Sequence, residues 1–111
     1  MSVETIWARE IDRLAANANI EFWDVRAKTD YEKKHLKTAR NVPYLEYDEN
    51  PGKIEKMMDR NKIYILYCDR GGVSMAFARE LDKKGYHVKS VLGGLTTYRG
   101  NNIWEATKSN D

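Results

Sequence analysis

A single cysteine, Cys68, is the strongest candidate for chemistry in this sequence of 111 residues. It directly follows an apolar run, and the next five residues are Asp69, Arg70, Gly71, Gly72 and Val73. Cysteine is nucleophilic as the thiolate, which needs a positive local potential to form near neutral pH. Glycines let a loop curl so that its N–H groups point at an anion, and a following helix adds its own free N–H groups. We therefore expect Cys68 to be the nucleophile and residues 69–73 to form its anion-binding loop, with Arg70 as a cation over the loop.

One cysteine limits the chemistry that the chain can perform. It excludes an internal disulfide and a Cys-x-x-Cys redox pair. It also excludes a zinc site built from several cysteines, and two distant histidines, His35 and His87, do not supply one. We therefore expect no metal and no cofactor. The alternative for any lone cysteine is that it is a small buried apolar residue without a reaction.

The spacing around Cys68 separates two kinds of anion chemistry. Cysteine phosphatases and the arsenate reductases that resemble them require an arginine six positions after the cysteine. Position 74 in this chain is Ser74. The sequence therefore argues against phosphoryl transfer.

Alternating strand and helix patterns must position the loop. The predicted strands are Val3–Ile6, Ile20–Val25, Ile63–Tyr67 and Val88–Leu92, with a short extended piece at Arg40–Val42. The first predicted helix runs from Trp7 to near Asn17, and a second begins at Asp30, where Thr29 and Glu32 have the spacing of a capping box. A third begins at Pro51. A fourth runs from the end of the cysteine loop to Gly85, and a final helical turn covers Leu95–Tyr98. This order predicts one α/β domain over residues 1–111 with a mainly parallel sheet. Ligands of such sheets bind at the carboxyl ends of the strands, where Cys68 lies.

The same patterns predict which side chains are buried. Trp7, Trp23 and Phe77 are expected in the core. The helix that begins at Pro51 is expected to bury Ile54, Met57 and Met58. The helix after the cysteine loop is expected to bury Val73, Ala76, Phe77 and Leu81.

Five short motifs in order resemble the rhodanese (sulfurtransferase) family over almost the whole chain. They are Asp24-Val25-Arg26; Tyr31 with His35-Leu36; Asn41-Val42-Pro43; Tyr67-Cys68 opening a six-residue loop to Val73; and Leu92-Gly93-Gly94 with Tyr98. The resemblance implies a central, mainly parallel five-stranded sheet with helices on both faces. It also implies that Cys68 takes sulfur from an anionic donor such as thiosulfate, holds it as a persulfide in the amides of residues 69–73, and gives it to cyanide, a small thiol or a protein sulfur acceptor.

Two departures from the family pattern keep a second hypothesis open. Many members end the loop with arginine where this chain has Val73, and Asp69 places a negative charge beside the nucleophile. The alternative is therefore a catalytically weak or inactive binding or regulatory module of the same fold. Presence of Cys68 in a loop of the sulfurtransferase length favours the enzyme.

The remaining polar and aromatic residues are given structural roles. An ion pair is expected between Asp24 and Arg26, a structural hydrogen bond for His35 rather than a proton relay, and a surface position for His87. Trp104 either packs back on the domain or belongs to an interface. A basic cluster is interpreted mainly as a solvated face, with a weak field for a small anion as the alternative; it contains Lys28, Lys33, Lys34, Lys37 and Arg40.

Composition is that of an ordinary globular chain. Hydrophobic residues make up 41% and charged residues 32%, and the formal net charge is +2. This charge is too small to indicate nucleic-acid binding, and no apolar run is long enough to span a bilayer. We expect a cytoplasmic protein with no nucleic-acid or membrane partner.

Overall fold

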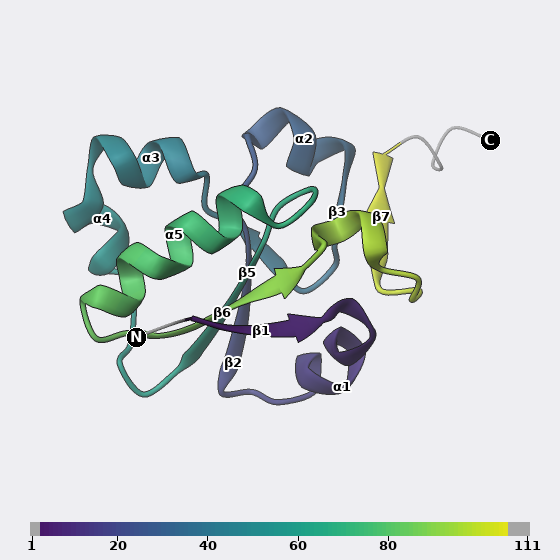
Figure 1. Cartoon of the computed structure of the whole chain (residues 1–111). Coiled ribbons are helices and arrows are strands. Elements are labelled where there is room, and N and C mark those ends of the chain that lie inside the picture. The colour runs from purple at the N-terminus through teal and green to yellow at the C-terminus, as the bar shows by residue number, and fades with distance from the viewer. Residues whose placement is uncertain (1–2, 107–111) are drawn as a thin grey trace.

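The computed structural model describes residues 3–106 and contains a central sheet of five parallel strands (Figure 1). Across the sheet the strands are β1 (Glu4–Trp7), β6 (His87–Leu92), β5 (Ile63–Tyr67), β2 (Ile20–Asp24) and β4 (Ala39–Asn41). The predicted α/β fold with a five-stranded parallel sheet is confirmed.

Strand β5 lies at the centre of the sheet and is buried on both faces. It pairs with β6 on one side and with β2 on the other. Its side chains alternate between two cores: Tyr64 and Leu66 belong to one, and Ile65 and Tyr67 to the other. A continuous apolar run is what a strand in this position requires. The loop that begins at Cys68 therefore leaves the central strand of the sheet, which is covered on both faces.

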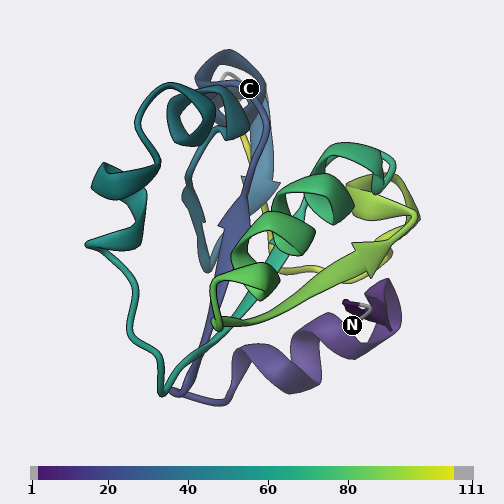
Figure 2. The same ribbon diagram turned by 60° about the vertical axis from the view of Figure 1, so that its left-hand side comes forward.

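Helices cover both faces, as predicted (Figures 1 and 2). Three α-helices pack on the face of Tyr64 and Leu66: α3 (Tyr44–Glu49), α4 (Pro51–Glu55) and α5 (Gly72–Lys83). The opposite face is covered by the 3₁₀ turn η1 (Ala8–Glu10), α1 (Ile11–Ala15) and the 3₁₀ turn η2 (Gly94–Thr97). Helix α2 (Lys28–Lys33) places Tyr31 against this second core.

A second, small sheet was not predicted from the sequence. Strand β3 (Lys34–Leu36) pairs antiparallel with β7 (Ile103–Glu105), which sets His35 opposite Trp104. The His35 ring is stacked on Tyr31, with centroids 3.7 Å apart, and on Trp104, at 5.0 Å. Trp104 therefore packs back on the domain, which was one of the two predicted outcomes.

Several local predictions are wrong at helix starts. Helix α2 begins at Lys28 and follows Ala27, and Thr29 and Glu32 form no capping box. The expected first helix is divided into η1 and α1, and α3 was missed. In contrast, Asn50 caps α4 as expected, because its side chain accepts a hydrogen bond from the Lys53 amide at 3.3 Å.

The core prediction is correct for Trp23 and Phe77, which are fully buried, and wrong for Trp7, which is 52% exposed. Trp7 ends an edge strand, and only the Arg9 guanidinium, 5.1 Å from the ring centroid, lies over it among the described aromatic and cationic contacts. Met57 is also exposed, whereas Ile54 and Met58 pack in the core as expected.

The inner face of α5 contains Phe77 and Leu81 as predicted, but not Val73 or Ala76. Val73 is exposed, and the buried residues are Ser74, Phe77, Ala78 and Leu81. The helix begins at Gly72, earlier than the apolar pattern indicated, so its first turn presents Ser74 to the interior. This rotation places a hydroxyl beside Cys68.

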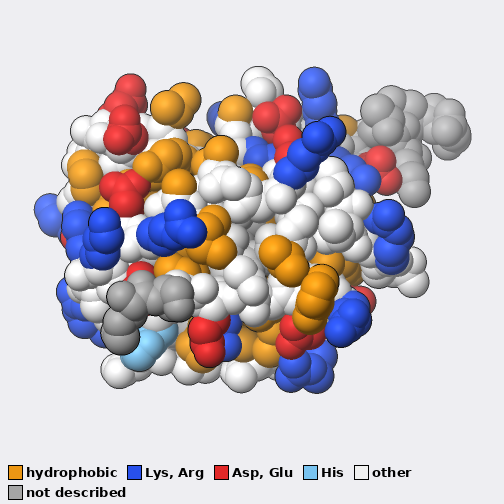
Figure 3. Space-filling model, in the orientation of Figure 1, with side chains coloured by type: hydrophobic (Ala, Val, Ile, Leu, Met, Phe, Trp, Pro, Cys, Tyr) orange, Lys and Arg blue, Asp and Glu red, His pale blue; other side chains and the backbone are white. Residues whose placement is uncertain are grey.

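Basic and acidic side chains are interspersed on the face seen in Figure 3, without a single large basic patch. In the described part of the chain, no helix is long and apolar enough to cross a membrane.

Candidate functional site

Three chain segments meet at the carboxyl ends of β5, β2 and β6. Asp24 and Tyr67 are paired at the ends of β2 and β5, so Cys68 lies beside the residues that follow Asp24. The turn after β6 closes over the cysteine loop: the Leu95 amide donates to the Cys68 carbonyl at 2.8 Å, and the Thr96 amide donates to the Asp69 carbonyl at 3.1 Å. The site is thus at the predicted edge of the sheet.

Two glycines make this close approach possible. Gly71 has a φ of +103°, and Gly94 has a φ of +64°. A Cβ on Gly94 would lie 2.4 Å from the Asp69 carbonyl oxygen, closer than any side chain tolerates. Gly72 has no positive φ, and a Cβ there would meet nothing within 4 Å. Both loop glycines were predicted to permit the curl of the loop. Of the two, only position 71 requires glycine, because only there is φ positive.

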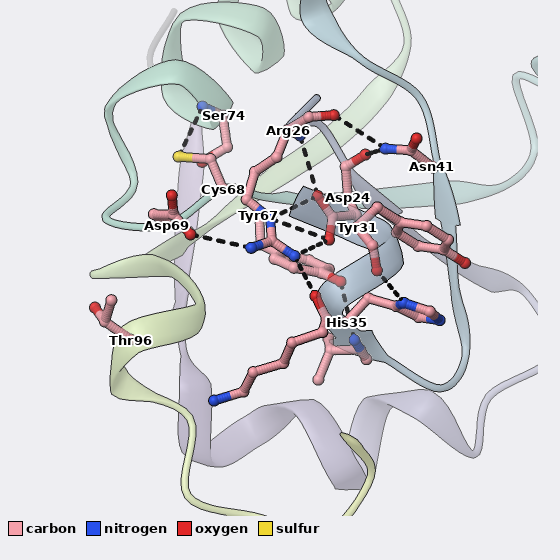
Figure 4. A network of polar contacts seen from close by, with 12 residues as sticks. Asp24, Arg26, Tyr31, His35, Asn41, Tyr67, Cys68, Asp69, Ser74 and Thr96 are labelled. Atoms are coloured by element: carbon pink, nitrogen blue, oxygen red, sulfur yellow. Dashed lines mark hydrogen bonds and ion pairs between the residues drawn. The ribbon is translucent and has the colours of Figure 1, made fainter. Parts of the chain in front are cut away.

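The sulfur of Cys68 accepts hydrogen bonds from backbone amides of the loop and of α5, and Figure 4 shows the one from Ser74. The amides of Gly71 and Ser74 donate to Sγ at 3.1 and 3.4 Å, and the Ser74 hydroxyl oxygen is 3.6 Å away. Burial alone would raise the pKa of Cys68, which is 6% exposed, but hydrogen bonds from Ser74, Gly71 and the Arg70 backbone outweigh it and lower the pKa. The geometry therefore favours the thiolate, as the sequence predicted.

Ser74 is a site residue that sequence reasoning missed. It was noted only because it is not an arginine, yet both its amide and its hydroxyl face the sulfur. The hydroxyl is fully buried, lies 2.8 Å from the Ser90 hydroxyl of β6, and donates to the Gly71 carbonyl at 3.3 Å. The signal was its position in the first turn of the helix that follows the loop.

Arg26 is a second missed residue of the site. The predicted ion pair with Asp24 is present and bidentate: Nε donates to Oδ1 at 3.0 Å and Nη2 to Oδ2 at 2.8 Å. Arg26 also donates to the Lys34 carbonyl of β3 and, through Nη1, to Asp69 Oδ1 at 3.1 Å (Figure 4). Burial by itself would lower the pKa of Arg26, and the hydrogen bonds and charge of Asp24 raise it overall. The guanidinium therefore stays charged beside the cysteine loop.

Cys68 opens into a surface pocket of about 360 Å³. The pocket is lined by residues of the loop and one residue of the neighbouring strand end: Arg26, Cys68, Asp69, Arg70, Gly72 and Val73. Arg70 is exposed and lines this pocket. Val73 contributes an apolar wall, because its side chain is exposed rather than packed in the core.

Other candidates lie outside the pocket. The Nδ1 atom of His35 is hydrogen-bonded to the Tyr31 carbonyl, which confirms the structural role, and His87 is exposed at the start of β6. All five members of the basic cluster are exposed, which confirms the solvated face. The cluster does not contribute to the pocket lining.

Comparisons with known proteins agree with this geometry. Residues 8–101 match the family described as the Rhodanese-like domain. A tRNA sulfurtransferase from Desulfurococcus amylolyticus is 33% identical over 84% of this chain, although the match spans only 17% of that protein. The thiosulfate sulfurtransferase GlpE from Coxiella burnetii is 29% identical over 78% of each chain.

Solved structures share the fold. The Bacillus anthracis CoADR-RHD protein has 31% identity and a TM-score of 0.76, covering 86% of this chain and 16% of that chain. The rhodanese-like domain of Anabaena protein Alr3790 aligns with all of this chain and 85% of that chain at a TM-score of 0.82 and 16% identity. At such low identity the second likeness shows the fold alone.

Proposed function

Because the chain belongs to the rhodanese-like domain family, we propose that it is a sulfurtransferase whose Cys68 carries sulfur as a persulfide. The observation that carries the proposal is the hydrogen bonding around Sγ: the Gly71 and Ser74 amides donate to the sulfur, and the Ser74 hydroxyl oxygen lies 3.6 Å from it. A buried cysteine without chemistry needs no such donors. Relatives named sulfurtransferases support the same class.

The reaction proceeds in two displacements. The Cys68 thiolate attacks the outer sulfur of an anionic donor such as thiosulfate, so that the donor S–S bond breaks as the Cys68 S–S bond forms and sulfite leaves. A thiolate or cyanide then attacks the outer sulfur of the persulfide, and the Cys68 thiolate is the leaving group. The same donors that lower the pKa of Cys68 stabilise the persulfide anion and the departing thiolate.

The site is suited to an acceptor that can approach a nearly buried sulfur from an open surface pocket. Cys68 is 6% exposed at the base of a pocket of about 360 Å³. A small thiol, cyanide or a cysteine on a flexible protein segment reaches the sulfur without movement of the sheet. Sulfur transfer to such an acceptor is the second half of the proposal.

Turnover with thiosulfate and cyanide tests the assignment through a Cys68→Ser variant. We expect thiocyanate formation by the natural chain and the uncatalysed rate for the variant, with circular dichroism spectra that coincide. A Ser90→Ala variant serves as a control for changes in the buried hydroxyl pair and should retain turnover. Thiocyanate formation by Cys68→Ser at the parent rate would exclude the persulfide route, and no turnover by the natural chain with any sulfane donor would favour a binding or regulatory module.

A further inference from the structure

The charges around the pocket nearly cancel. Its lining contains two cations, Arg26 and Arg70, and one anion, Asp69. A second anion, Asp24, is fully buried directly behind Arg26 and holds it through two hydrogen bonds. Two positive and two negative charges leave no net positive charge for an incoming donor. A pocket that captures dianions by charge would be expected to keep an excess of cations.

Asp69 is the residue that removes this excess. Its Oδ1 accepts a hydrogen bond from Arg26 Nη1 at 3.1 Å, which occupies the part of the guanidinium that faces the pocket. The Nε and Nη2 donors of Arg26 are directed at Asp24 and at the Lys34 carbonyl. Arg26 therefore offers little of its charge or hydrogen-bonding capacity to a ligand while Asp69 is ionised.

Asp69 is held at the mouth of the pocket through both its backbone and its side chain. The backbone carbonyl of Asp69 accepts from the Thr96 amide at 3.1 Å, and the side chain is bound by Arg26 (Figure 4). The side chain is nevertheless 62% exposed, so a donor entering the pocket meets it directly. The Asp69 carboxylate is therefore fixed beside Arg26 and is not turned away from the pocket into solvent.

From these contacts we propose that Asp69 is a specificity-determining residue that disfavours dianionic sulfur donors relative to donors with one negative charge, such as thiosulfonates and persulfides. The inference rests on the proposed sulfur transfer at Cys68 and narrows its donor class. A dianion suffers twice the repulsion of a monoanion from the Asp69 carboxylate, and Arg26 is already neutralised. The selection acts on donor capture rather than on the attack at sulfur.

Both donor classes follow the same balanced displacement. With thiosulfate, the Cys68 thiolate takes the outer sulfur and sulfite leaves with both of its charges. With a thiosulfonate, the donor S–S bond breaks in the same way and a sulfinate leaves with one charge. With a persulfide, a thiolate leaves. The product on the protein is the Cys68 persulfide in each case, so donor charge can be varied without changing the bond that is broken.

Donor-charge discrimination in Asp69 variants tests the proposal. The kcat/KM values for thiosulfate and for benzenethiosulfonate are measured with cyanide as the acceptor, for the natural chain, Asp69→Asn and Asp69→Glu. In Asp69→Asn we expect the thiosulfate-to-benzenethiosulfonate ratio of kcat/KM to rise about fivefold, as loss of one charge near the donor predicts. Asp69→Glu keeps the charge and should keep the ratio. Added salt should reduce the difference between the Asn and Glu variants.

A matched ion pair provides the control. Glu4 pairs with Lys89 at 3.2 Å, at the amino end of β1 and thus at the opposite end of the sheet, and Glu4→Gln changes the net charge by the same amount. It should leave the ratio unchanged. A ratio in Asp69→Asn within twofold of the natural chain would overturn the inference while turnover persists. If neither donor loads sulfur on Cys68 of the natural chain, the proposed function itself fails, and the inference fails with it.

Discussion

The Cys68 thiol is buried, yet donors from Ser74 and the loop backbone lower its pKa. Ser74→Ala removes the hydroxyl 3.6 Å from the sulfur and keeps the amide. Since the hydroxyl stabilises the thiolate, its loss should raise the pKa of Cys68 and move the midpoint of iodoacetamide alkylation to higher pH. At a fixed pH below that midpoint, the variant should react more slowly.

Ser90→Ala separates this direct effect from the loss of a buried hydrogen bond. Both variants break the 2.8 Å contact between the two hydroxyls, but Ser90→Ala leaves Ser74 beside the sulfur. We expect each to cost about 1 kcal/mol of stability and only Ser74→Ala to shift the alkylation midpoint strongly. An equal shift in the two variants would contradict a direct role for the Ser74 hydroxyl.

The two arginines of the pocket should respond differently to removal. Arg26→Ala leaves the fully buried Asp24 carboxylate without its bidentate partner, which should lower the free energy of unfolding by about 3–5 kcal/mol. Arg70 is exposed, so Arg70→Ala should change stability by less than about 0.5 kcal/mol. Urea unfolding of both variants measures the difference, and similar losses would contradict the assigned network.

Arg70→Ala should instead affect donor binding. Arg70 lines the pocket, and the attack at sulfur is supported by backbone amides that this change leaves in place. We expect a higher KM for thiosulfate with a smaller fall in kcat, the pattern of lost ground-state binding. Steady-state kinetics at fixed cyanide decide this: a fall in kcat at constant KM would instead place Arg70 in the stabilisation of departing sulfite.

Individual residues were predictable where their neighbours in sequence define the environment. Cys68 and its loop follow a recognisable strand and precede a helix, so their place at the sheet edge could be inferred. Arg26 contacts Asp69 only because β2 and β5 are paired, a contact between residues 43 apart in the chain. The role of Ser74 depended on where α5 begins, and helix boundaries are weakly specified by apolar spacing.

At the scale of elements, the turn after β6 and the cysteine loop pack backbone against backbone. Gly94→Ala would place a Cβ 2.4 Å from the Asp69 carbonyl oxygen in a residue with positive φ. We expect it to lower the free energy of unfolding by more than about 2 kcal/mol and to reduce sulfur transfer. Gly72→Ala is the matched control, because its Cβ meets nothing within 4 Å, and it should retain stability. Equal stability of the two variants would contradict this packing.

Elements of strong and continuous pattern were predicted best. The apolar run of β5 and the long helix α5 were found, and the parallel arrangement of the sheet followed from the alternation of strands with helices. Strands β3 and β7 have three residues each, too few for a period to emerge, and their pairing joins segments far apart in sequence. Helix α3 was missed because only the extended piece Arg40–Val42 was assigned in this region, whereas Pro43 is the residue that precedes a helix.

At the scale of the molecule, the residue at position 74 distinguishes the site from that of cysteine phosphatases. Phosphatases place an arginine at the position of Ser74, whose side chain here is fully buried between Cys68 and Ser90. We expect no Cys68-dependent hydrolysis of p-nitrophenyl phosphate. Comparison of the natural chain with Cys68→Ser measures this, and a higher rate for the natural chain would contradict the assignment of the loop.

Intact-mass spectrometry tests the central claim most directly. The reduced protein is incubated with thiosulfate or benzenethiosulfonate, desalted, and divided between buffer and cyanide. The account predicts a mass gain of one sulfur atom that cyanide reverses. The gain should be absent from Cys68→Ser, which contains no cysteine because Cys68 is the single one in the sequence. An unchanged mass with both donors, or a gain that persists in Cys68→Ser, would contradict a persulfide on Cys68.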